Sequence, residues 1–445
     1  MPKINDNPHS TRLHEFLNER VRLAGKVSGF VQRASKLSAE VFVKTLVLGL
    51  AAQPQASLSE LAEQSAKMGV AISPQGLDER INERAVKMLQ DLFAQAIQLF
   101  QSQTKLAGAS LTQFSSIHIL DSSIITLPAP MQTVFAGCKA VGGVAALKIQ
   151  LSFEYLRGQL SAVQVEAGRC PDQKCRLQLD QAAANNLHLF DLGYFTVAVF
   201  AALDQAKAFF ISRFQTQTAL YALDGSSGKI ELAQILAQQT DALYEQDYLM
   251  GLTHRLKVRL IAQRLPESVT AERRRKTRAK MRKKGRTASA AHLALLPWNI
   301  FVTTVPAARL TALQVMAFYR LRWQIELVFK LWKSCAQLDQ VGTWRTERVL
   351  CVLYAKLIGL VIFHWRAAPH RVMDNQELSW PKAFRRWQAA IPAVLKALSR
   401  SVRSLQAVCR ALATDFHHKA LKTRRRKSPS TYHLVLSLEP ALPLA

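Results

Sequence analysis

The stretch that decides the fold is YRLRWQIELVFKLWK, which spans residues 319–333. It contains neither proline nor glycine, and this composition predicts one continuous helix. At about 100° per residue, Arg322, Glu326 and Lys333 lie at roughly 300°, 340° and 320° from Tyr319, within a stripe about 60° wide. The apolar side chains cluster on the adjacent face, where they can pack against a core: Leu321, Ile325, Val328, Phe329 and Trp332. The stretch therefore predicts a helix that buries one side and presents a carboxylate among cations on the next.

The polar stripe has two interpretations. It can be the solvated side of an ordinary amphipathic helix, or it can hold a metal ion and a phosphate together. Its spacing, Tyr-x2-Arg-x3-Glu-x6-Lys, resembles the Tyr-Arg-Glu-Lys signature of the IS4-type DDE transposases of bacterial insertion sequences. Four residue types at three spacings rarely match by chance, so the second interpretation is favoured.

That family has two further carboxylates, at strand ends upstream, and this sequence has a candidate for each. The apolar segment 116–121 ends at Asp121, and the apolar segment 187–191 ends at Asp191. The continuation Asp-Leu-Gly-Tyr after residue 190 matches the family pattern Asp-x-Gly-Tyr/Phe. The resemblance implies that Asp121, Asp191 and Glu326 are the catalytic residues and the metal ligands.

Carboxylates at the ends of neighbouring strands point into one cleft. Such oxygen ligands suit Mg²⁺ or Mn²⁺. Two ions about 3.5–4 Å apart can activate a water on one side of a phosphodiester and stabilise the leaving oxygen on the other. We therefore expect Mg²⁺ (or Mn²⁺) as the cofactor, as two ions, and no organic cofactor. Glu154 and Glu166, in a predicted hairpin, are the main rival carboxylates.

The resemblance also implies phosphate contacts. Arg322 and Lys333 would clamp backbone phosphates beside the metal ions, with Lys330 close enough to join them, and Tyr319 would bind a phosphate near the cleavage point. Arg213, which ends a predicted strand, is a further phosphate candidate. The alternative for these side chains is solvation at the protein surface.

Trp298 is the candidate for contact with a base. Family members that form a DNA hairpin stack a flipped base on an aromatic side chain of a β-rich insertion, and Trp298 lies in the corresponding region. Such stacking contributes about 1–3 kcal/mol per base, which can offset the unstacking of a terminal pair. The equal alternative is a core tryptophan at the start of a strand. The tryptophans at 323, 332 and 344 are expected to pack.

The composition indicates a polyanionic partner. The 445 residues carry a formal net charge of +28, and 49% of them are hydrophobic, which allows a large core. Double-stranded DNA, as transposon-end inverted repeats and target DNA, is the first candidate, and an anionic membrane surface is the second. The most apolar run, residues 349–363, falls short of the roughly 20 residues that span a bilayer, so we expect a buried core helix. The start of the sequence has no signal-peptide core, which predicts a cytoplasmic, nucleoid-associated bacterial protein with no membrane partner.

The order of the elements predicts an α/β fold. An RNase H-like mixed sheet flanked by helices is interrupted by a mostly β insertion, with helical regions at both ends of the chain. The expected domains are a helical N-terminal DNA-binding domain (1–105), the two parts of an RNase H-like catalytic domain (106–215, and 309–368 with the catalytic helix), the insertion (216–308) and a basic helical C-terminal region (369–445).

Local signals support parts of this plan. Ser57 and Glu60 have the spacing of a capping box, and Ser73-Pro74 is typical of a second helix start; the pair is compatible with a DNA-reading helix-turn-helix. Within the insertion, residues 273–286 hold ten basic residues and no acid. Such a dense run predicts an extended or frayed arm unless a polyanion neutralises it.

The resemblance implies cut-and-paste transposition. Water nicks one strand at the end of the element, the freed 3′-hydroxyl attacks the opposite strand to form a hairpin, water opens the hairpin, and the 3′-hydroxyl attacks target DNA. A homodimer in the DNA complex is implied as well. The alternatives are a domesticated DNA-binding regulator without catalysis and a plain RNase H-like nuclease. The three acids argue against the first alternative, and the insertion and its basic run argue against the second.

Overall fold

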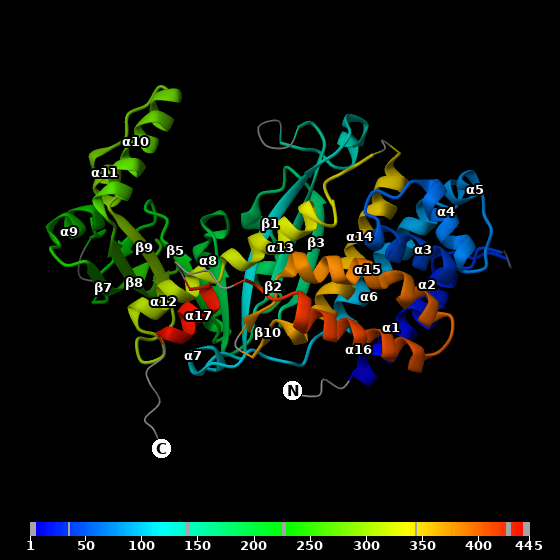
Figure 1. Cartoon of the computed structure of the whole chain (residues 1–445). Helices are drawn as coiled ribbons and strands as arrows, with labels where there is room; N and C mark the ends of the chain where they lie inside the picture. The colour runs from blue at the N-terminus through cyan, green and yellow to red at the C-terminus, as the bar shows by residue number, and fades with distance from the viewer. Residues whose placement is uncertain are drawn as a thin grey trace, which may run out of the picture. The chain divides into compact units, whose positions relative to one another are not determined.

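A computed structural model describes residues 6–33, 36–138, 143–224, 228–342, 345–374, 376–423 and 429–438 (Figure 1). The chain forms two compact units, and it passes between them several times. Unit 1 contains residues 1–106, 122–170 and 324–426, and unit 2 contains residues 107–121, 171–323 and 427–445. Strand β1 (Ser116–Thr126) belongs to both units, since the division falls between Asp121 and Ser122.

Unit 1 packs helices against a small sheet. Its strand order is β3-β2-β1, with β2 and β3 antiparallel. Its strands are β2 (Ala146–Glu154) and β3 (Gln159–Ala167), with the short pair β10 (Val372–Met373) and β11 (Gln376–Glu377). Its helices are α1 (Asp6–Glu15), the π-helix Phe16–Arg20, α2 (Val21–Val27), α3 (Ala39–Ala52), α4 (Leu58–Lys67), α5 (Pro74–Glu79), α6 (Glu83–Leu99), α13 (Trp323–Ser334), α14 (Thr346–Ala367), α15 (Trp380–Leu398) and α16 (Val402–Lys419).

Helix α14 is the core of unit 1. It contacts α3 and α6 along its length, and nearly every residue from Leu353 to Ala367 is buried. Among the described residues it is the one helix that is long and apolar enough to cross a membrane, and 78% of its apolar window is buried inside the protein. The expectation of a buried core helix at 349–363 is therefore confirmed.

Unit 2 continues the sheet from the first half of β1. Its strand order is β1-β4-β5-β9-β8-β7-β6, in which β1, β4 and β5 run parallel and β9 is antiparallel to β5. The strands are β4 (Asn186–Phe190), β5 (Phe209–Arg213), β6 (Leu220–Tyr221), β7 (Leu243–Met250), β8 (Leu256–Arg264) and β9 (Trp298–Thr303). The helices are α7 (Ala109–Thr112), α8 (Val197–Gln205), α9 (Leu232–Gln238), α10 (Glu267–Lys283), α11 (Ala290–Leu295), α12 (Ala312–Arg320) and α17 (Thr431–Ser437).

The mixed sheet flanked by helices confirms the expected fold class. An antiparallel hairpin followed by three parallel strands, with β1 in the middle, is the arrangement of an RNase H-like sheet. The predicted helix starts are also present. Ser57 and Glu60 form a complete capping box at α4, and Ser73 caps α5 with Pro74 at its first position.

The prediction of one helix over residues 319–333 is wrong. Helix α12 ends at Arg320, the chain turns at Leu321–Arg322, and α13 begins at Trp323. At the turn the backbone N–H of Leu321 bonds to the carbonyl oxygen of Phe318 (2.9 Å), three residues earlier, instead of four. Leu321 is fully buried there and Arg322 is held by two aspartates, so tertiary contacts override the local helix propensity.

The basic run also differs from its prediction. Residues 267–283 form the α-helix α10 rather than an extended arm. Lys, Arg, Glu and Ala all have high helix propensity, and the two acids of the helix pair with bases one or two turns away: Glu267 with Arg274 (3.4 Å) and Glu272 with Lys276 (2.7 Å). The predicted insertion thus combines helices α9, α10 and α11 with its strands.

Candidate active site

Two of the predicted carboxylates stand side by side because of strand register. Parallel strands β1 and β4 pair Leu120 with Phe190, the residues just before Asp121 and Asp191. Strand β5 is the next parallel strand, and its Ser212 lies opposite Phe190. Arg213 therefore follows Ser212 as Asp191 follows Phe190. Asp121, Asp191 and Arg213 therefore form a row across three neighbouring strands.

Arg322 joins the two aspartates from the turn between α12 and α13. Its Nη1 donates to Oδ2 of Asp121 at 3.3 Å, and its Nε lies 4.0 Å from Oδ1 of Asp191. The Arg322 and Asp121 side chains are only 15% and 20% exposed, whereas Asp191 is 45% exposed. One guanidinium thus lies where two carboxylates converge, which identifies this point as a place that requires positive charge.

Tyr319 completes this cluster from the last turn of α12. Its hydroxyl donates to Oδ1 of Asp191 over a long 3.5 Å, and its ring packs edge-on against Phe301 of β9, the partner of Arg213. Burial, and then the charge of Asp191, raise the pKa of Tyr319 well above its usual value, while Arg322 and Arg213 act in the opposite direction. The phenol is therefore protonated at all ordinary pH values and acts as a hydrogen-bond donor.

Helix α13 carries the other predicted residues, all of them in unit 1. Glu326 lies in its first turn and Lys333 in its last, seven residues apart and so on one face of this helix. The Nζ of Lys333 donates to the carbonyl oxygen of Ile124 at 3.1 Å, just after the shared part of β1, and Lys330 is exposed. The adjacent side is the predicted apolar face: Ile325, Val328, Phe329 and Trp332 are buried.

The metal hypothesis can be tested against the donors present. Among the described residues, no group of three His, Cys, Asp or Glu side chains lies close enough together to hold a metal ion. The pair Asp121 and Asp191 offers carboxylate oxygens that converge on one cation, which is the donor chemistry of a hard divalent ion. The residues therefore fit a metal that is held in part by this pair.

The rival carboxylates have structural partners. Glu154 accepts the backbone N–H groups of Leu156 (2.9 Å) and Arg157 (2.7 Å) and so caps the turn between β2 and β3. Glu166 accepts from the side-chain amides of Gln150 and Gln164, each at 2.9 Å. Both lie in unit 1, and neither belongs to the row of Asp121 and Asp191.

Among the described tryptophans that were assigned a role, Trp323 differs from its expectation. Trp298 starts β9, is 4% exposed, and has the guanidinium of Arg264 stacked 4.6 Å from its ring centre, which is the packing alternative. Trp323, expected to pack, is 55% exposed directly after Arg322. Trp332 packs as expected and donates to Nε2 of His364 at 3.1 Å, and Trp344 lies outside the described residues. The exposure of Trp323 follows from the turn before it, which the helical pattern did not reveal.

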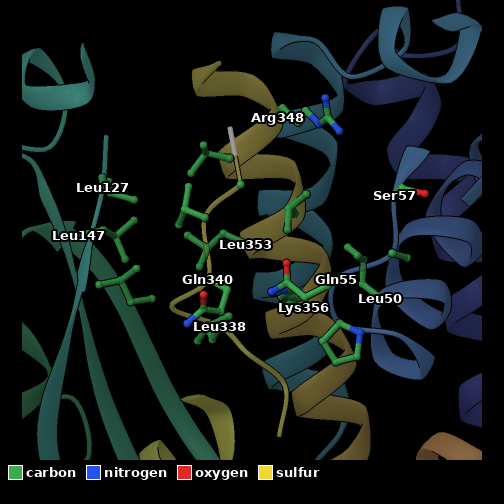
Figure 2. Close-up of a pocket in the computed structure, with 17 residues that line it drawn as sticks. Leu50, Gln55, Ser57, Leu127, Leu147, Leu338, Gln340, Arg348, Leu353 and Lys356 are labelled. Atoms are coloured by element: carbon green, nitrogen blue, oxygen red, sulfur yellow. The ribbon is translucent and has the colours of Figure 1, made fainter. Parts of the chain in front are cut away.

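Unit 1 also contains a cavity of about 220 Å³ that holds none of the predicted site residues. Figure 2 shows that the end of α3, the loop after α13, the sheet and α14 line it, with Leu50, Gln340, Leu147 and Lys356 among the side chains. Lys356 is almost fully buried, and its Nζ donates to the carbonyl oxygen of Gln337 at 2.7 Å. Burial lowers the pKa of Lys356 to about 8, against the opposing effect of Asp339.

Comparison with known proteins identifies the family of this chain. Residues 112–362 match the family model described as "Transposase DDE domain". The transposase for insertion sequence element IS231C of Bacillus thuringiensis subsp. berliner is 30% identical over 92% of this chain and 91% of its own length. That for IS1151 of Clostridium perfringens is 28% identical over 94% of this chain and 93% of its own length. The solved piggyBac transposase synaptic complex with hairpin DNA matches at 9% identity and a TM-score of 0.47, over 99% of this chain and 87% of that one.

The family match defines a DDE-type enzyme. The chain belongs to the transposase DDE-domain family. It is a transposase of the insertion-sequence type, and the resemblance seen at residues 319–333 is confirmed. Members of this family use divalent metal ions and act on DNA, which accords with the converging carboxylates and with the net charge of +28.

Proposed function

We propose that this transposase cuts and joins DNA at the ends of its own insertion sequence, with Asp121, Asp191 and Glu326 as the catalytic carboxylates. The observation that carries the proposal is the in-register pairing of β1 and β4, which sets Asp121 beside Asp191 and lets one cation serve both. Glu326 is added on the spacing that it shares with Arg322 and Lys333 in the sequence signature. The ions would be Mg²⁺ or Mn²⁺, two per site.

The reaction consists of exchanges of one P–O bond for another. Water attacks the phosphorus at the end of the element, the bond to the 3′-oxygen breaks, and a 3′-hydroxyl remains on the element. That hydroxyl then attacks the opposite strand to form a hairpin, a second water opens the hairpin, and the hydroxyl finally attacks target DNA. In each step the attacking group loses a proton and the leaving oxygen gains one. Bound divalent ions would lower the pKa of the attacking water and neutralise negative charge at the phosphate.

The side chains around the row have separate roles. Arg322 holds Asp121 and Asp191 before DNA binds, and its planar fork also suits the oxygens of a phosphate. We infer that the guanidinium turns to the scissile phosphate when other cations take over the aspartates. Tyr319, protonated and tied to Asp191, donates to a phosphate oxygen, and Arg213 adds charge at the end of the row. On α13, Lys330 and Lys333 contact the DNA backbone.

The exposure of the two candidate tryptophans decides which of them we propose to stack on the flipped base. Trp298 can receive a base only if Arg264 leaves its ring, whereas Trp323 already offers an open face beside Arg322. We therefore place the flipped base on Trp323 first and on Trp298 second. In hairpin assays, the Trp323→Ala protein should accumulate nicked DNA while first-strand nicking continues. The same behaviour in Trp298→Ala alone would reverse the assignment.

The remaining regions follow the predicted domains. We propose that residues 1–105, with α4 and α5, contact the terminal repeats, and that residues 106–215 and 309–368 form the catalytic domain. Residues 369–445 form a helical, basic C-terminal region. The active species on DNA would be a homodimer that brings two element ends together.

The test uses the purified protein, Mg²⁺ and a supercoiled plasmid that carries the gene with its own flanking DNA. We expect excised or hairpin-ended DNA from the wild type and from Asp204→Asn, a control that removes an exposed acid on α8. Glu326→Gln should give none. Linear fragments alone would indicate a nuclease, and DNA binding without cleavage in either Mg²⁺ or Mn²⁺ would indicate a regulator; both results contradict the proposal.

A further inference from the structure

Helix α10 has two different faces. At about 100° per residue, the positions from roughly 0° to 100° around Arg273 are buried or half-buried: Thr270, Arg273, Arg274, Thr277 and Met281. The remaining side carries six exposed bases, which we call the α10 cationic face: Arg275, Lys276, Arg278, Lys280, Arg282 and Lys283. In Figure 1 the helix extends beyond the ends of β8 and β9, so this face borders solvent along its length.

The cationic face is not built to contact protein. It has no exposed apolar stripe, so burial against another helix would gain little. The bases also repel one another at the spacings of three and four residues along the helix. The two acids of the helix, Glu267 and Glu272, both precede the bases of this face, and Glu272 pairs with Lys276. A partner with closely and regularly spaced negative charge removes this repulsion. Duplex DNA carries one phosphate per about 1.7 Å of axis.

The part of α10 that contacts the sheet lies next to the candidate active site within unit 2. Arg273 donates to the carbonyl oxygen of Trp298 (3.2 Å) and to Oδ1 of Asn299 (2.7 Å), at the start of β9. Strand β9 pairs with β5, and Phe301 of β9 lies opposite Arg213 of β5. Arg213 is the last residue of the row that Asp121 and Asp191 begin. Burial, and then the positive charge of Arg213, lower the pKa of Arg273.

We propose that the α10 cationic face binds the phosphate backbone of the duplex on one side of the scissile bond, and that Arg273 is a positioning residue that fixes the helix to β9. The proposal rests on the proposed function for the place of the cut. The nine residues from Arg275 to Lys283 span about 13 Å at 1.5 Å per residue. At 3.4 Å per base pair the contact covers about four base pairs, so the helix extends the DNA grip beyond the carboxylates and sets the direction in which the duplex leaves them.

The experiment is hydroxyl-radical footprinting on a duplex that contains one end of the gene's own flanking DNA. The variant Lys280→Gln/Arg282→Gln/Lys283→Gln removes three charges from the far end of α10 and keeps helix propensity. The control Arg385→Gln/Arg386→Gln/Lys396→Gln removes three exposed charges from α15. We expect the α10 variant alone to lose protection over the outermost few base pairs of one flank while it protects the cleavage point, and its log–log salt slope of binding to fall by about 3.

A second variant distinguishes the positioning of α10 by Arg273 from the charge of its cationic face. Arg273→Gln removes one base but frees the helix from β9, so we expect it to lose protection along the whole α10 tract with a slope change of about 1 or less. Arg273→Lys should keep only part of this protection, because an ammonium group cannot make the two hydrogen bonds of the planar guanidinium.

The outcomes are distinct from those of the cleavage test. A footprint of unchanged length in the α10 variant, or an equal shortening in the α15 control, overturns the proposal whether or not the wild type cuts. An absence of any protected tract with the wild type overturns it as well. A shortened footprint with a wild type that does not cut supports this surface and contradicts only the proposed function.

Discussion

At the scale of single residues, Arg322 shows what the active site requires. It is the cation that pairs with both Asp121 and Asp191 in a partly buried place. Without such a cation, two adjacent negative charges would repel each other. The same residue can therefore stabilise the free protein and be displaced when the reaction begins.

Arg322→Ala should make the protein depend on metal ions for stability. We expect a loss of about 1–3 kcal/mol in the free energy of unfolding, because two partly buried carboxylates lose their shared partner. Mg²⁺ should then raise the melting temperature of this variant more than that of the wild type. Arg320→Ala, which removes an exposed base two residues earlier at the end of α12, is the control. Equal shifts with Mg²⁺ in all three proteins would show that no ion binds at the aspartates.

The buried Lys356 predicts how the stability of the protein changes with pH. Its pKa is about 8 in the folded protein, against 10.5 for an ordinary lysine. Between these pH values the unfolded chain holds the additional proton, so stability rises with pH; below about pH 8 the folded state bears the full cost of a buried charge. Lys356→Met should therefore be more stable than the wild type by about 1–3 kcal/mol at pH 7. This advantage should shrink from pH 8 to 10.5 in urea unfolding, and a pH-independent difference, as expected for the exposed Lys396→Met, would contradict it.

The sequence pattern predicted these residue-scale features unequally. Asp121 and Asp191 could be predicted because each follows a run of buried apolar residues in one of two parallel strands. The expected strand end at Asp121 is wrong, since β1 continues to Thr126, and the two carboxylates are adjacent because the strands pair in register. The bridge made by Arg322 could not be predicted, since it depends on the direction in which the chain leaves α12. The burial of Trp298 under Arg264 was equally hidden, because these side chains meet only through the pairing of β8 with β9.

At the scale of elements, local capping signals were the most reliable guide. Ser57 and Glu60 bond to each other's backbone at the start of α4, as their spacing predicts. Continuous helical composition was a poorer guide, since residues 319–333 are interrupted by a turn with a buried leucine. Charge density was poorer still: residues 267–283 form a helix because propensity and two ion pairs outweigh repulsion that solvent and salt screen.

The α4 cap predicts a measurable contribution. Ser57→Ala should lower the free energy of unfolding of the transition that includes α4 by about 1 kcal/mol, because the N–H of Glu60 loses its acceptor. Ser59→Ala, two residues further into the same helix and equally exposed, is the matched control and should change it little. The measurement is urea unfolding followed by circular dichroism, and equal effects of the two substitutions would mean that the capping box is not formed.

At the scale of the whole molecule, the charge of +28 affects the free protein and its DNA complex in opposite ways. Self-repulsion destabilises the compact state at low ionic strength, and salt screens it. Salt also weakens DNA binding through counterion release. The six bases of the α10 cationic face alone correspond to a log–log slope of about −5.

Raising salt from about 20 to 200 mM should therefore increase the melting temperature of the free protein while it lowers that of the DNA complex, because the Debye length shortens over this range. Thermal melts with and without a flanking-DNA duplex measure both effects. A poly-anion of the same charge but flexible backbone, such as heparin, controls for simple charge neutralisation. A complex whose melting temperature rises with salt would mean that the positive charge does not serve DNA binding.

The division of β1 between the two units has a consequence for synthesis on the ribosome. Unit 1 needs residues up to 426 and unit 2 needs residues from 427 onward, although both begin within the first 107 residues. Neither can finish its core while translation is in progress, and early segments must wait for partners made last. An insertion-sequence copy that is interrupted before residue 426 would thus yield a chain that completes neither unit, and we expect such decayed copies to release no folded fragment that competes for the element's ends.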